Sequence, residues 1–69
     1  MLEEILAVVT RFVPVDVHGV RYIDLTDNYE DGTSEDARLG QESVPAGLTA
    51  GDKVLVSRAV NMIVALRRT

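Results

Sequence analysis

The chain has 69 residues, is 46% hydrophobic and 26% charged, and carries a formal net charge of −4. A chain this short forms one domain, so we expect a single domain over residues 1–69 with a small core. It contains no cysteine, which excludes disulfide bonds and thiolate metal sites as sources of stability.

The N-terminal region predicts a strand over residues 5–13. Its side chains are apolar on both faces, as in the central strand of a sheet, and the valine-rich composition of the chain favours strands over helices. An N-terminal helix is the alternative, because the helical spacing i, i+3, i+4, i+7 is also present, at Leu2, Ile5, Leu6 and Val9.

Residues 13–24 predict a β-hairpin, because two runs of alternating apolar side chains flank the pair His18-Gly19. Gly19 supplies the positive φ that a two-residue hairpin turn requires, and histidine tolerates it. Pro14 has no N–H for the ladder, which is compatible with an edge strand or a bulge. In this register one face is apolar and the other carries an ion pair, with the cross-strand pairs Val17–Val20, Val15–Tyr22 and Asp16–Arg21.

The second half of the chain predicts short strands separated by turns. Residues 27–32 are rich in turn formers and indicate a loop, and residues 33–39 form a weak strand candidate. Residues 44–52 contain two glycines and a proline and indicate a connector with room for one short helical turn, followed by a strand at 53–57. The last segment, 60–66, alternates as a strand does, although a helical spacing at Ala59, Met62, Ile63 and Leu66 leaves a terminal helix as the alternative.

The order of these elements resembles an OB-fold. The segments that carry the resemblance are Asp31-Gly32-Thr33, Val44-Pro45-Ala46-Gly47-Leu48 and Gly51-Asp52-Lys53-Val54. The resemblance implies an all-β domain, a small five-stranded OB-like barrel whose closure removes exposed sheet edges. An SH3-like barrel, or an α+β domain with terminal helices, is the alternative. At this level the resemblance implies no specific function.

No stretch of the chain carries a catalytic or cofactor motif. Its single histidine, His18, lies in the expected hairpin turn without a nucleophile beside it. The acidic stretch fails the EF-hand pattern, because with Gly32 at the sixth loop position Tyr29 and Arg38 occupy ligand positions. We therefore expect no enzyme activity, no cofactor and no metal.

Charge is distributed unevenly along the chain. Residues 27–52 hold seven acidic residues and one basic residue, whereas residues 53–69 hold four basic residues and no acidic one. Such asymmetry indicates a binding or assembly module that contacts a protein partner, or another copy of itself, through an acidic loop and a basic C-terminal strand. The two regions could also pair with each other within one molecule. The candidate partner-binding residues are Glu30, Asp31, Glu35, Asp36, Arg58, Arg67 and Arg68.

Single-stranded nucleic acid is the alternative partner, because OB-folds often bind it with aromatic side chains and a positive surface. Tyr29, Lys53 and Arg58 are the candidate residues, but a pI of about 4.7 opposes binding to phosphates. No apolar run approaches the roughly 20 residues that span a bilayer, and no signal peptide is recognisable. We therefore expect no membrane contact and a cytoplasmic location.

Overall fold

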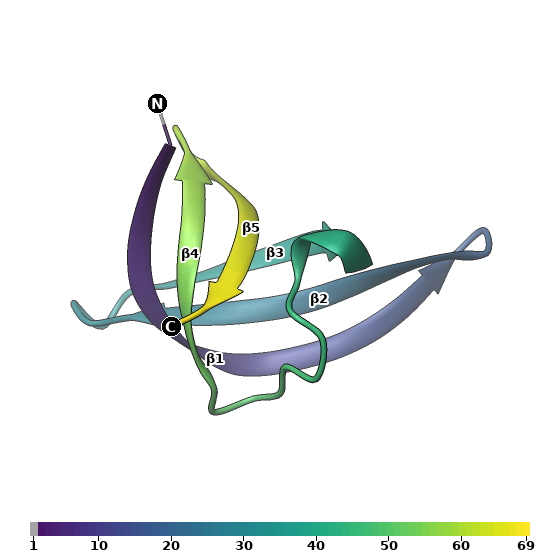
Figure 1. Cartoon of the computed structure of the whole chain (residues 1–69), viewed down its shortest axis with the longest axis horizontal. Helices are drawn as coiled ribbons and strands as arrows, with labels where there is room; N and C mark the ends of the chain where they lie inside the picture. The colour runs from purple at the N-terminus through teal and green to yellow at the C-terminus, as the bar shows by residue number, and fades with distance from the viewer. Residues whose placement is uncertain (1) are drawn as a thin grey trace.

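The computed structural model describes residues 2–69, which form one antiparallel sheet of five strands (Figure 1). The strand order across the sheet is β3-β2-β1-β4-β5. The all-β class and the strands at both ends of the chain are therefore confirmed, and the alternative with terminal helices is wrong. The elements are β1 Leu2–Val17, β2 Val20–Tyr29, β3 Ser34–Gly40, the short 3-10 helix η1 Gln41–Ser43, β4 Lys53–Ala59 and β5 Met62–Arg68.

Strand β1 is long enough to belong to both halves of the sheet. Its first part pairs with β4 and its second part with β2, and a bulge between Val9 and Arg11 lies where the partners change. Bulges increase local twist and bend a strand, and β1 curves strongly in Figure 1. The loop before β4 holds this bend, because the Val9 N–H donates to Asp52 O (2.9 Å) and the Gly51 N–H donates to Val9 O (2.6 Å).

The core lies on the concave face of the bent sheet. Alternate residues in the middle of β2 and β4 are buried, as expected for a sheet with one solvated face. Leu48, in the loop between η1 and β4, is buried in the same cluster. The buried hydrophobic residues are Ala7, Val9, Ile23, Leu25, Leu39, Leu48, Val54, Val56, Ile63 and Leu66.

The sheet is open along one seam. Its two edge strands, β3 and β5, come close to each other, but no β-ladder joins them within residues 2–69. The closed five-stranded barrel, OB-like or SH3-like, is therefore not confirmed, although the strands that such a barrel needs are present.

The hairpin at the centre of the chain is confirmed in its register. Val15 lies opposite Tyr22, Asp16 opposite Arg21, and Val17 opposite Val20. His18 and Gly19 have φ values of 51° and 79°, as a two-residue turn with both central residues left-handed requires. Figure 1 shows the end of this hairpin, residues 15–22, reaching beyond the rest of the sheet; we call it the arm. Pro14 lies where β1 has no second neighbour, so it blunts a free sheet edge.

Two turns differ from the predictions. The expected loop at 27–32 is wrong in its first half, because β2 continues to Tyr29, and Asp27 and Asn28 pair with both β1 and β3. Pairing on both sides outweighs the low strand propensity of Asp27 and Asn28. Strand β4 likewise extends beyond the expected residue 57 to Ala59, and a two-residue turn, Val60-Asn61, leads into β5.

Candidate functional site

The concave face changes from apolar to polar at one end of the molecule. On β2, Asp27 and Tyr29 occupy the next inward positions after Leu25. On β3, Glu35 is the first inward residue, and on β4, Arg58 occupies the next inward position after Val56. The same alternation that builds the core therefore directs these four polar side chains toward a common region.

A groove of about 510 Å³ lies above this region, where the β2–β3 turn meets β1 and β4. Its volume is within the range of ligand-binding clefts. Ile5 and Leu6 of β1 give it an apolar wall. We call it the acidic groove; its other lining residues are Tyr29, Glu30, Asp31, Thr33, Ser34, Glu35 and Arg58.

A chain of polar contacts crosses the acidic groove. The Tyr29 hydroxyl donates to Glu35 Oε1 (2.5 Å), and Arg58 Nη2 donates to Glu35 Oε2 (3.0 Å). Arg58 Nε also lies 2.8 Å from Glu35 Oε1, and Arg58 Nη1 lies 3.5 Å from Glu3 Oε1. The Tyr29 hydrogen bond, followed by Arg58, lowers the pKa of Glu35, so this carboxyl is ionised at neutral pH. Burial and the neighbouring Glu35 raise the pKa of Tyr29, which keeps its proton.

Asp27 is buried next to this network, opposite Glu35. Its exposed fraction is 0%, and neither carboxylate oxygen has a hydrogen-bond partner among the described residues. It lies between Val9 of β1 and Glu35 of β3 in the strand register. Burial, and secondarily the charge of Glu35, raises the pKa of Asp27 to about 6. This carboxyl therefore titrates near neutral pH, unlike an exposed aspartate.

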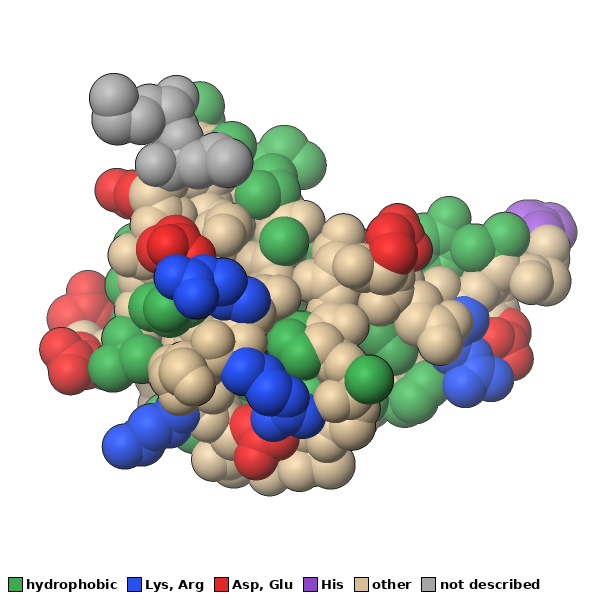
Figure 2. Space-filling model, viewed as in Figure 1, with side chains coloured by type: hydrophobic (Ala, Val, Ile, Leu, Met, Phe, Trp, Pro, Cys, Tyr) green, Lys and Arg blue, Asp and Glu red, His purple; other side chains and the backbone are tan. Residues whose placement is uncertain are grey.

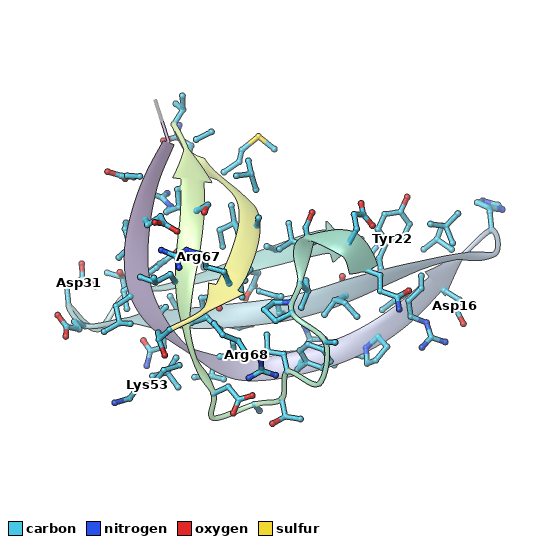
Figure 3. All side chains as sticks on the ribbon, viewed as in Figure 1. Asp16, Tyr22, Asp31, Lys53, Arg67 and Arg68 are labelled. Atoms are coloured by element: carbon cyan, nitrogen blue, oxygen red, sulfur yellow. The ribbon has the colours of Figure 1, made fainter. Side chains whose placement is uncertain are left out.

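The basic C-terminal strand is paired within the chain. Both Arg67 Nε and Nη2 donate to the carboxylate of Glu4 (2.5 and 3.0 Å). Arg68 donates to Ala46 O (2.7 Å) and lies 4.0 Å from Asp52. Figure 3 places Arg67 and Arg68 at β5 and Asp31 at the β2–β3 turn. Of the three predicted arginines, Arg58 alone lines the acidic groove.

The acidic loop is not compensated in the same way. Within residues 2–69, Glu30, Asp31 and Asp36 form no ion pair. Asp31 accepts hydrogen bonds from the backbone and hydroxyl of Thr33, and Asp36 accepts one from the Thr26 hydroxyl (2.7 Å). Figure 2 shows acidic side chains at the end of the molecule opposite the arm, whereas basic ones on the visible face mostly lie beside acidic ones.

The structure thus brings together four of the seven predicted partner-binding residues, with Tyr29 as a fifth predicted residue. Glu30, Asp31, Glu35 and Arg58 line one groove, while Asp36, Arg67 and Arg68 lie outside it. Of the residues proposed for nucleic acid, Lys53 lies with Tyr29 around a neighbouring hollow of about 230 Å³. Arg58 is occupied by Glu35 and Glu3.

Comparisons with known proteins assign no family. No protein-family model matches the chain, and no curated protein or solved structure is significantly similar to it. In the described part of the chain, no group of three or more His, Asp or Glu side chains is arranged to hold a metal ion. None of the helices in residues 2–69 is long and apolar enough to cross a membrane.

The arm presents a second distinctive surface. Val15, Val17, Val20 and Tyr22 alternate with the inward residues of the hairpin, so they lie on the face turned away from the core. Val20 is 52% exposed. Figure 3 places Asp16 and Tyr22 on the arm, far from Asp31 and the acidic groove.

Sequence reasoning missed Asp27 as a site residue. The signal was present, because Ile23, Leu25, Asp27 and Tyr29 have the two-residue spacing of one strand face. Treating Asp27 as the start of a loop hid the fact that a carboxylate stands on the buried face.

Proposed function

We propose that the protein is a non-enzymatic protein-binding module whose acidic groove accepts a basic segment of a protein partner. One observation carries this proposal: Glu30 and Asp31 line a groove of ligand-binding size without any cation paired to them in residues 2–69. Uncompensated charge at a concave surface favours a partner of opposite charge, through both steering and complementarity.

The pairing of the C-terminal arginines supports a separate partner over a second copy of the chain. Arg67 and Arg68 already have carboxylate neighbours in Glu4 and Asp52, and pairing with another chain would require these contacts to be exchanged. Self-association through the acidic loop and the basic strand is therefore the weaker form of the proposal. We also propose that the sheet is an OB-like barrel. The strand order supports this, because it makes β3 and β5 the two edge strands, and these edges come close to each other along one seam.

Binding of short peptides with matched charge variants tests the proposal. Calorimetric titration with a lysine-rich peptide should show binding, whereas a glutamate-rich peptide of equal length should not bind. Glu30→Lys should weaken binding several-fold, because it reverses a charge on the groove wall. Glu42→Lys makes the same change in η1, outside the groove, and should leave the affinity unchanged.

The alternative partner is examined in the same experiment. A single-stranded oligonucleotide that bound more tightly than the lysine-rich peptide would contradict the proposal. Equal weakening by Glu30→Lys and Glu42→Lys would also contradict it, because binding would then depend on net charge rather than on the groove.

A further inference from the structure

The network at the base of the acidic groove has more acids than bases. Glu3 and Glu35 share a single cation, Arg58, which lies within ion-pair distance of both, and Asp27 lies opposite Glu35 in the strand register. The Arg58 and Glu35 side chains are only 20% and 28% exposed, so solvent screens this imbalance less than it would on an open surface.

None of the elements packed around Asp27 supplies a partner. Strand β3 places Glu35 opposite it, and β1 places the apolar Val9 on the other side. Its own strand contributes Tyr29, whose hydroxyl donates to Glu35, and β4 contributes Arg58, which is occupied by Glu35 and Glu3. A buried carboxylate without a partner is stable only when it is protonated or matched by a cation.

The groove has a lining that suits a cation next to Glu35, although Asp27 itself is buried behind this lining and does not form part of it. Tyr29 lies two residues after Asp27 on β2, and Glu35 lies opposite Asp27 on β3. Both Tyr29 and Glu35 line the groove. Ile5, Leu6 and the Tyr29 ring can cover an aliphatic stem, while Glu30 and Asp31 lie at the same groove. These features suit one long cationic side chain, that of lysine or arginine.

Building on the proposed function, we propose that the groove takes one lysine or arginine side chain of the partner beside Glu35, the residue opposite Asp27 in the strand register, and that Asp27 releases its proton to solvent as the cation binds. No bond is formed or broken except the O–H bond of the Asp27 carboxyl. Binding and deprotonation are then linked, so the affinity rises with pH while the free protein still holds that proton.

The magnitude follows from the two states of Asp27. The pKa of the Asp27 carboxyl is about 6 in the free protein, and a bound cation that lowered it to its ordinary value would raise the affinity about tenfold between about pH 5 and pH 7. This is the upper limit, because burial, the larger cause of the raised pKa, remains when the cation binds. The probe is a capped, otherwise uncharged peptide with one central lysine. Its matched control has norleucine in place of lysine, which keeps the stem and removes the charge.

Calorimetry in two buffers of different ionisation enthalpy counts the protons released. Near pH 6, the wild-type protein should release on average a fraction of one proton for each lysine peptide bound. The norleucine peptide should bind weakly or not at all. Asp27→Asn should still bind the lysine peptide, with no proton release and a flat pH profile. If Asp27→Asn does not fold, the number of protons released when the wild-type protein binds the lysine peptide tests the inference by itself.

The outcomes separate this inference from the proposed function. Lysine-peptide binding without proton release, or an unchanged pH profile in Asp27→Asn, overturns the inference and leaves the groove as a basic-segment site. Equal binding of the lysine and norleucine peptides overturns the cation site. Failure of both peptides and of the lysine-rich peptide contradicts the proposed function as well.

Discussion

Replacing Asp27 by asparagine should make the protein more stable above neutral pH and remove a large part of its pH dependence. In the wild type, the folded-state pKa of Asp27 is about 6, above the ordinary value of an unfolded aspartate near 3.9. The folded state therefore binds this proton more tightly than the unfolded state. The protonated Asp27 therefore contributes fully to the free energy of unfolding at low pH, and this contribution is lost as the pH rises through about 6.

The size of the effect follows from the shift of about two pKa units, which corresponds to at most about 3 kcal/mol. Roughly half of this amount should be lost between about pH 5 and pH 8, because the transition is already under way at pH 5. For a domain of this length the whole free energy of unfolding is about 3–10 kcal/mol. One buried carboxyl thus controls a substantial part of the stability.

Urea unfolding followed by circular dichroism at several pH values measures this effect. The wild type should lose stability from pH 5 to pH 8, whereas Asp27→Asn should stay nearly constant over this range. Other carboxyls, such as Glu35 and Asp24, have lowered pKa values, so their contribution is lost only at more acidic pH and has the opposite sign. A wild-type stability that does not change from pH 5 to pH 8, or an Asp27→Asn variant less stable than wild type at pH 8, would refute the reasoning.

Two further predictions concern the β4–β5 turn and the C-terminal strand. Val60 has a φ of 57° and is 83% exposed, so Val60→Gly should raise the free energy of unfolding by about 1 kcal/mol by relieving left-handed backbone strain. The control, Val20→Gly, lies at an exposed strand position and should lower the free energy of unfolding. A loss of stability in both variants would contradict the presence of strain at Val60. Because Arg67 and Arg68 are paired within the chain, the mass measured by light scattering should not change between low and high salt; oligomers that dissociate as salt rises would show instead that these charges meet between chains.

The hairpin was predictable because its information is local. Alternating valines and the His18-Gly19 pair define both the faces and the turn, and the observed register agrees with the predicted pairs. The strands at the two ends were harder, since their apolar patterns fit helical and strand spacing alike. Valine content resolved them correctly, because β-branched side chains pack well on a pleated sheet.

The candidate site was only partly predictable because it depends on contacts distant in sequence. The bulge after Val9 lies where β1 passes from its pairing with β4 to its pairing with β2 alone, and no local sequence signal marks it. The Arg67–Glu4 pair joins residues 63 positions apart, so the sorting of charge along the chain could not show which charges remain unpaired. Val60 was missed as a turn residue because valine rarely adopts a left-handed backbone.

The most direct test of the central claim is a nuclear magnetic resonance titration of the labelled protein with the lysine-rich peptide. Binding in the acidic groove predicts that amide signals of Glu30, Asp31, Glu35 and Arg58 shift together, while those of Val17 and Val20 on the arm stay in place. Shifts confined to the arm, or absent at every peptide concentration, would contradict the account.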